Sequence, residues 1–393
     1  MFSVPLYRNT EGKNAYQTWV ELGTPLQHNN HDYGFYLDYA SSSCAVATAA
    51  CPQCAGYYDQ SLSSSYSASP LDFTLAKMWS NVAKVAIDFY GTMGKESLCL
   101  DHDATKCLTD YDFFKITEID GVDYWPWNGI LGLAPQASTH GPSIVTAFYN
   151  QGVIDKNIAT IYYTRETDGS KLIFGGTLDN AIPIGTHEVP QEWEETWSFE
   201  MTDFTINGAR IDGSDAVFAQ LNPSQPGILL TGDDLKVFQD KVLAQFPDAA
   251  CGEDFCSFQG QCSDSLLSGL PTLSITLDST QYDMLPADYT INSGSKCNAL
   301  VGKHNADRHF YILGDSFFQR YPPTMSFDEP VSMTFNQIVD SADASLLKTD
   351  TVASGPSTMA VVGTAGAFLA VGAALFIKRR NAKRAATVEY LMM

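Results

Sequence analysis

The sequence predicts a mostly β protein with two similar lobes, and two observations support this fold class. Runs rich in Val, Ile, Phe, Tyr and Thr alternate with Gly and Asn-Gly turns, as between Trp197 and Ile211. A short hydrophobic strand that ends in glycine, Ile130-Leu131-Gly132, recurs as Ile312-Leu313-Gly314 about half a chain later. Because a buried strand ending in Gly lets another backbone approach closely, we expect one such strand in each lobe.

Length and composition agree with this fold class. With 393 residues, 45% of them hydrophobic and 12% aromatic, the chain can bury a large core or two smaller ones, which argues against a disordered protein. The formal net charge is −22 at pH 7. Such an acidic surface repels nucleic acid, so we expect no nucleic-acid partner, and it fits an acidic or extracytoplasmic compartment.

Two segments have a helical pattern instead of a strand pattern. The first runs from Ser143 to Gln151, and the second runs from Asp233 to Phe246 with acidic residues in its first turn. The apolar residues that share one face of the second segment are Leu235, Phe238, Val242 and Leu243.

The end of the chain predicts a membrane anchor. Residues 359–377 are uncharged and apolar all round, close to the ~20 residues that cross a bilayer as a helix, and Lys378-Arg379-Arg380 follow. The positive-inside tendency places this basic end in the cytosol. The predicted organisation is an N-terminal lobe (1–185), a C-terminal lobe (186–338), a flexible stalk rich in Ser, Ala, Thr and Asp (339–358), a transmembrane helix (359–377) and a basic cytosolic tail (378–393).

The stretch from Phe35 to Val46 is the first candidate site. An aromatic and apolar run leads directly to Asp38, and small hydroxyl residues follow it. This pattern predicts a carboxylate at the end of a buried strand, where chemistry is often placed.

The neighbouring motifs carry a family resemblance. Gly23-Thr24-Pro25 precedes this stretch, Cys51-Pro52-Gln53-Cys54 and a serine-rich turn follow it, and Lys171 to Thr177 and Tyr311 to Tyr321 match later segments. In this order and spacing, roughly Tyr16 to Asn336 resembles the pepsin-like aspartic proteases. The resemblance implies the bilobal pepsin-like fold, with a peptide or polypeptide bound in the cleft between the lobes.

The catalytic motif departs from the family pattern. Members of the family normally have Asp-Thr-Gly-Ser-Ser at the positions where this chain has Asp38-Tyr39-Ala40-Ser41-Ser42. No Asp-Thr-Gly or Asp-Ser-Gly occurs anywhere in this chain. Two facing carboxylates that share a proton activate a water in this family. The resemblance makes Asp38 the first of the pair. Matching Ile228-Leu229-Leu230 to the family's second motif puts Ser224, which cannot carry the charge or the shared proton, in the place of the other.

Other acidic residues have structural interpretations. We interpret Asp233 and Asp234 as residues that suit the positive end of a helix dipole, and Asp315 as part of the structural Ile-Leu-Gly-Asp match.

The stretch from Phe89 to Gly94 resembles the family's Tyr-Gly-Thr-Gly hairpin, whose tyrosine closes over substrate. The resemblance therefore implies that Tyr90 and Gly91, together with Ser41, contact the substrate. An alternative interpretation is a surface aromatic residue in a glycine-containing hairpin turn.

Cysteine usage favours disulfides. Cys51-x-x-Cys54 fits zinc binding or redox exchange as well, but no second Cys-x-x-Cys or close histidine pair completes a metal site, so we expect no metal and no cofactor. The resemblance suggests a small loop closed by Cys51 and Cys54 and a bridge from Cys262 to Cys297. The other pairings stay open, and the odd total of nine leaves one thiol over.

Two functions fit these observations. The first is a membrane-anchored pepsin-like homologue that has lost peptidase activity and binds polypeptides in its cleft. The second is an active aspartic endopeptidase working at acidic pH. The chain lacks a Gly-x-Ser-x-Gly elbow and a phosphate-binding loop before a helix. We expect a single-pass membrane protein whose large domain is extracellular or lumenal, with a signal segment upstream of Met1.

Overall fold

The computed structural model describes most of residues 1–339. The residues outside the described part are 9–15, 28–33, 40, 42–43, 57, 81–84, 101–102, 104, 136–140, 165–168, 191–195, 212–213, 215, 224, 305–309 and 340–393. The predicted stalk from residue 340 onward, the predicted membrane span and the basic tail therefore lie outside the described residues. Within the described part, no helix is long and apolar enough to cross a bilayer.

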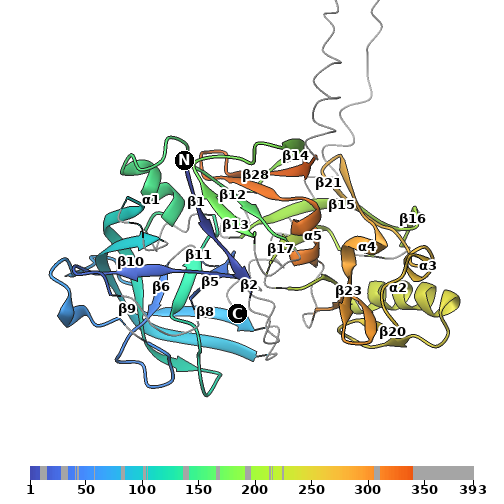
Figure 1. Ribbon diagram of the computed structural model, residues 1–393, viewed down its shortest axis with the longest axis horizontal. Helices are drawn as coiled ribbons and strands as arrows, with labels where there is room; N and C mark the ends of the chain where they lie inside the picture. The colour runs from blue at the N-terminus through green and yellow to red at the C-terminus, as the bar shows by residue number, and fades with distance from the viewer. Residues whose placement is uncertain are drawn as a thin grey trace, which may run out of the picture. The chain divides into compact units, whose positions relative to one another are not determined.

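The N-terminal lobe is built on one large sheet, drawn in blue to green on the left of Figure 1. Its main path, in spatial order, is β2 (Tyr7–Arg8), β3 (Tyr16–Thr18), β5 (Phe35–Asp38), β11 (Gly129–Gly132), β6 (Ala45–Ala47), β10 (Cys107–Asp120), β9 (Val85–Leu100) and β4 (Val20–Leu22). Two further strands, β7 (Ser67–Ala68) and β8 (Leu75–Ser80), pair with β9. A short 3-10 helix, η1 (Gln60–Leu62), precedes β7.

The C-terminal lobe contains two sheets, drawn mainly in yellow and orange on the right of Figure 1. The larger has the order β22 (Thr280–Met284), β21 (Leu273–Leu277), β15 (Ser198–Ile206), β17 (Phe218–Leu221), β26 (Phe310–Leu313), β18 (Ile228–Leu230) and β25 (Val301–Lys303), with β16 (Ala209–Arg210) on β15. The smaller has the order β19 (Ala250–Cys251), β20 (Cys256–Gln259), β24 (Lys296–Ala299) and β23 (Thr290–Ser293).

A fourth sheet joins the two halves of the sequence. Its order is β1 (Phe2–Pro5), β13 (Lys171–Phe174), β12 (Ile158–Tyr162), β27 (Pro323–Ser326), β28 (Ser332–Ile338) and β14 (Ala181–Glu188). Strand β12 of the first half pairs with β27 of the second, so the lobes share main-chain hydrogen bonds. The predicted lobe boundary after residue 185 falls inside β14.

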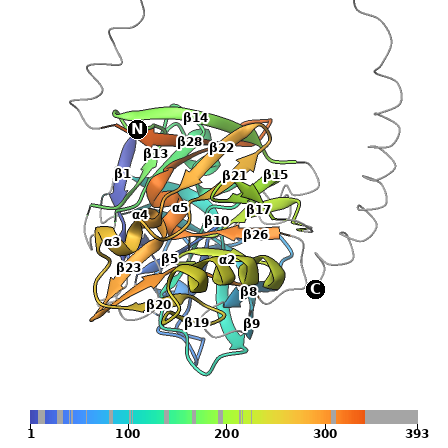
Figure 2. The same cartoon turned by 90° about the vertical axis from the view of Figure 1, so that its right-hand side faces the viewer.

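Five short helices cover the sheets: α1 (Ile144–Asn150), α2 (Gly232–Gln245), α3 (Asp264–Leu267), α4 (Pro286–Tyr289) and α5 (Asp315–Arg320), all within the described residues. Both predicted helices are confirmed. Ser143 caps α1, and Thr231 caps α2. Helix α2, labelled in Figure 2, packs on β18 and β25. Asp233 and Asp234 lie in the first turn of α2, as expected for acidic residues near the positive end of the helix dipole.

The two lobes repeat one three-stranded arrangement. In the first lobe β11 lies between β5, to which it is parallel, and β6, to which it is antiparallel. In the second lobe β26 lies in the same way between β17 and β18. The predicted mostly β fold with two similar lobes is therefore confirmed, and the two Ile-Leu-Gly strands are the central strands of the repeat.

The described residues contain four disulfides. The expected pairs Cys51–Cys54 and Cys262–Cys297 are confirmed. The remaining pairs are Cys99–Cys107, directly opposite across β9 and β10, and Cys251–Cys256, directly opposite across β19 and β20. Cys44 is the thiol left over, and it is fully buried.

Candidate active site

Asp38 ends strand β5 and is almost completely buried, with 4% of its surface exposed. It lies opposite Gly132 in the parallel pair β5–β11. Its backbone carbonyl accepts a hydrogen bond of 2.7 Å from the Leu133 N–H, and the Ala134 N–H donates to the Ser41 carbonyl at 3.0 Å. The carbonyls of Asp38 and Ser41 are thus both hydrogen-bonded to the two residues that follow Gly132. These bonds fix the position of the Asp38 backbone.

The strand register identifies the residue that corresponds to Asp38 in the second lobe. Leu37 lies opposite Leu131 in the first Ile-Leu-Gly strand, and Leu221 lies opposite Leu313 in the second. Asp38 follows Leu37, and Asn222 follows Leu221. Asn222 is therefore the counterpart of Asp38.

The antiparallel partners give the same answer. Ala45 pairs with Ile130, and Leu229 pairs with the equivalent Ile312. Ala45 follows Asp38 by seven residues, and Leu229 follows Asn222 by seven residues. The Ile-Leu-Leu match that pointed to Ser224 is displaced by two residues from this register. Ser224 lies outside the described residues, so its predicted place at the site stays a prediction.

The loop after Asn222 is anchored to the C-terminal lobe by its backbone. The Asn222 N–H donates to the Leu313 carbonyl, and the Gln225 N–H donates to the Asn222 carbonyl, both at 3.0 Å. The Asp315 N–H donates to the Gln225 carbonyl at 2.6 Å. Pro223, which follows Asn222, is buried and has no N–H to donate.

Two other buried aspartates have structural partners. The Asp234 carboxylate accepts from the hydroxyls of Ser214, Thr231 and Tyr311 at 2.8, 2.7 and 2.6 Å, so it joins the start of α2 to β26. Asp315 begins α5 and accepts from the Tyr16 hydroxyl at 3.2 Å and from the Gln319 amide at 2.6 Å. These contacts agree with the structural roles expected for both residues.

Tyr39, directly after Asp38, points into the protein interior. Only 1% of its surface is exposed. Its hydroxyl lies 3.3 Å from the hydroxyl of Tyr163, and its ring centroid lies 5.6 Å from that of Phe318 in α5. Burial raises the pKa of the Tyr39 hydroxyl well above its usual value, an effect that the hydrogen bond with Tyr163 opposes.

The stretch predicted as a hairpin has a different structure. Residues 89–94 run within the single strand β9, so the predicted turn around Gly91 is wrong. Gly91 lies instead where a side chain would collide with the carbonyl oxygen of Lys115 in β10, beside a register shift after Ile116. The hairpin that follows β7 is formed by β8 and β9, and its connection, residues 81–84, lies outside the described residues. Tyr90 is 37% exposed.

Sequence comparison agrees with this architecture. The family model for eukaryotic aspartyl proteases matches residues 15–332. The chain belongs to the eukaryotic aspartyl protease family. It is 24% identical to pepsin A of Canis lupus familiaris over 318 residues, covering 77% of this chain and 76% of that protein. Pepsin II-2/3 of Oryctolagus cuniculus is 23% identical and pepsin A of Bos taurus is 24% identical, each over 314 residues and 77% of this chain, with 76% and 78% of those proteins covered.

The strand register gives one equivalent position in each lobe. Asp38 occupies this position in the first lobe, and Asn222 occupies it in the second. Among the described residues, no group of three or more His, Cys, Asp or Glu side chains is arranged to hold a metal ion.

Proposed function

We propose that this chain is a membrane-anchored pepsin-like homologue with impaired peptidase activity that binds polypeptide segments between its lobes. The strand register supports the proposal. Asn222 follows Leu221, which pairs with Leu313, just as Asp38 follows Leu37, which pairs with Leu131. Family membership supports the polypeptide ligand.

The chemistry of an Asp–Asn pair explains the impairment. Two carboxylates close together share one proton, so one accepts a proton from water while the other donates to the peptide carbonyl. The Asn222 carboxamide has nearly the same shape as a carboxylate but is neutral at every pH and cannot donate an acidic proton. Loss of positioned acid-base catalysis costs about 10²- to 10⁴-fold in rate.

A second candidate is an active aspartic endopeptidase, and one observation favours it. The Asp38 loop keeps its hydrogen bonds to Leu133 and Ala134 although Tyr39 replaces the family's threonine. One acid is therefore held in place, and activity would require a second acid from a different position.

Four proteins distinguish these functions: the full-length wild type and the variants Asp38→Asn, Asn222→Asp and Ser224→Asp. Each is incubated in detergent with a denatured protein at pH values between about 3 and 6, with and without a pepstatin-type inhibitor. We expect no inhibitor-sensitive cleavage by the wild type and a gain of about tenfold or more for Asn222→Asp, which restores the pair.

Ser224→Asp is the matched control, because it adds the same charge two residues away. A gain with Ser224→Asp but not with Asn222→Asp would show that the register assignment fails. Inhibitor-sensitive cleavage by the wild type that disappears in Asp38→Asn would reject the impaired enzyme in favour of the active endopeptidase.

The membrane anchor is part of the proposal and rests on sequence alone. Residues 359–377 are uncharged and are followed by Lys378-Arg379-Arg380, which suits a single span with the large domain on the extracellular or lumenal side. The full chain is expected to stay in membranes after alkaline carbonate washing, whereas a chain ending at residue 358 is released. Release of both would reject the anchor.

A further inference from the structure

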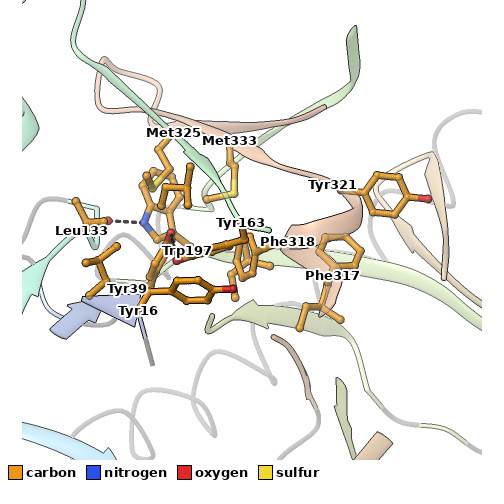
Figure 3. Close-up of a cluster of buried hydrophobic side chains, with 14 of the residues drawn as sticks. Tyr16, Tyr39, Leu133, Tyr163, Trp197, Phe317, Phe318, Tyr321, Met325 and Met333 are labelled. Carbon is orange, nitrogen blue, oxygen red and sulfur yellow. Dashed lines mark hydrogen bonds between the residues drawn. The ribbon is translucent and has the colours of Figure 1, made fainter. Parts of the chain in front are cut away.

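The side chain that follows Asp38 makes contacts across the two lobes. Tyr39 belongs to the N-terminal lobe, and its ring packs against Phe318 of helix α5 in the C-terminal lobe (Figure 3). Both side chains are buried, and Phe318 has no exposed surface. The loop that carries the retained acid is therefore in direct contact with the opposite half of the molecule.

A second route links the same loop to the same helix. The Tyr39 hydroxyl meets the Tyr163 hydroxyl, and the rings of Tyr163 and Tyr16 lie with centroids 3.9 Å apart. The Tyr16 hydroxyl then donates to Asp315, the first residue of α5. These buried hydroxyls are satisfied by one another and by Asp315, as buried polar groups require.

A third contact holds the strand beside Asp38. Trp197, which is fully buried and begins the C-terminal lobe, donates its indole N–H to the Leu133 carbonyl at 2.7 Å (Figure 3). The N–H of the same Leu133 donates to the Asp38 carbonyl. The backbone carbonyl of Asp38 is thus linked through Leu133 to Trp197 of the second lobe.

The residues that follow the two equivalent positions differ between the lobes. Asp38 is followed by Tyr39, and Asn222 is followed by Pro223. A proline has neither a hydroxyl nor an N–H, so the loop of the second lobe has no donor there to match the Tyr39 hydroxyl.

We infer that Tyr39 is a positioning residue that fixes the Asp38 loop to helix α5. The aromatic ring supplies the contact across the lobes, and the hydroxyl supplies the link through Tyr163 and Tyr16. This role concerns the position of Asp38 and does not depend on whether the protein cleaves peptides.

Amide hydrogen exchange on the full-length protein tests the inference. The Leu133 N–H reports directly on the Asp38 backbone, since the two are hydrogen-bonded. In Tyr39→Thr, we expect the protection of the Leu133 and Ala134 amides and of the α5 amides to fall by about tenfold or more relative to the β9–β10 ladder.

Tyr58→Thr is the matched control. Tyr58 is also 1% exposed, but its ring packs on Phe113 and its hydroxyl bonds Glu96, both within the N-terminal lobe. This variant is expected to spare Leu133 and α5 and to loosen β9 and β10. Equal loss of protection across the molecule in both variants, or unchanged Leu133 and α5 amides in Tyr39→Thr, would overturn the inference.

Tyr39→Phe and Tyr58→Phe keep the aromatic rings and extend the test if the threonine variants do not fold. The same selectivity is expected on a smaller scale, with a drop at Leu133 of a few-fold in Tyr39→Phe alone. A uniform drop, or no drop at Leu133, would contradict a positioning role for Tyr39.

Discussion

Several tyrosine hydroxyls are enclosed in the interior of this protein, and their burial affects its response to alkali. Desolvation raises the pKa of Tyr39, Tyr111 and Tyr163 well above the usual value. The folded protein therefore keeps these protons after the unfolded chain has released its own. The contribution of these tyrosines to the free energy of unfolding is fully present below a pH of about 10, the pKa of tyrosine in the unfolded chain. It falls as the pH rises further.

We expect Tyr39→Phe to make the alkaline loss of stability less steep. Phe has no proton to release, so the free energy of unfolding should fall by about 1.4 kcal/mol less for each pH unit above about 10. Denaturant unfolding of wild type and variant between pH values of about 8 and 11.5 measures this slope. Parallel curves for the two proteins would show that Tyr39 titrates normally.

At the scale of elements, the second lobe depends on a close approach between the strand β26 and the loop after Asn222. Gly314 directly follows β26, and a side chain there would collide with the carbonyl oxygens of Gln225 and Gly227. The equivalent glycine of the first lobe, Gly132, lies opposite Asp38. Gly314 thus allows a second backbone to approach closely, which is what the Ile-Leu-Gly pattern indicated.

Gly314→Ala is expected to lower the free energy of unfolding by about 1–3 kcal/mol, because the added methyl group must displace backbone atoms. Gly252→Ala is the control, since nothing lies within 4 Å of the position its methyl group would take. That change should stay within about 0.5 kcal/mol. Equal effects of the two substitutions in denaturant unfolding would refute the crowding at Gly314.

Turns and helix ends, which depend on neighbouring residues, could be predicted from the sequence. The register of the strands depends on distant partners and could not. The Asn207-Gly208 turn has positive φ at both residues, and the predicted helices begin directly after the polar N-cap residues Ser143 and Thr231. The predicted turn around Gly91 was wrong because glycine is common both in turns and where two strands approach closely.

The strand register of the second lobe could not be derived from the sequence for a similar reason. Ile228-Leu229-Leu230 matches the family in isolation, whereas the partners of β17 and β18 give Asn222, two residues before Ser224, as the position equivalent to Asp38. The role of Ser224 itself stays a prediction. The equal spacing of Asp38 to Ala45 and of Asn222 to Leu229 was present in the sequence, but without the register nothing singled it out.

At the scale of the whole molecule, the formal net charge of −22 at pH 7 means that like charges repel one another in the folded state. Added salt screens this repulsion between exposed groups. Protonation of carboxylates at acidic pH removes part of this repulsion, which fits the acidic or extracytoplasmic compartment that the sequence led us to expect.

We therefore expect the melting temperature at pH 7 to rise when the salt concentration increases from about 0.02 to 0.3 M. The rise should be smaller at a pH of about 5, where fewer carboxylates are ionised. Differential scanning calorimetry of the detergent-solubilised full chain measures both. A salt effect that is absent at neutral pH, or larger at acidic pH, would show that net repulsion does not limit stability.

Pro223 directly follows Asn222 in the sequence, and this has a consequence for slow chemical change in the stored protein. Asparagine loses its amide spontaneously when the next backbone nitrogen attacks the side chain and closes a succinimide ring. The nitrogen of proline carries no hydrogen and cannot complete that ring closure. Stored protein will thus keep asparagine at this position and will not generate a second acid by slow deamidation through this route.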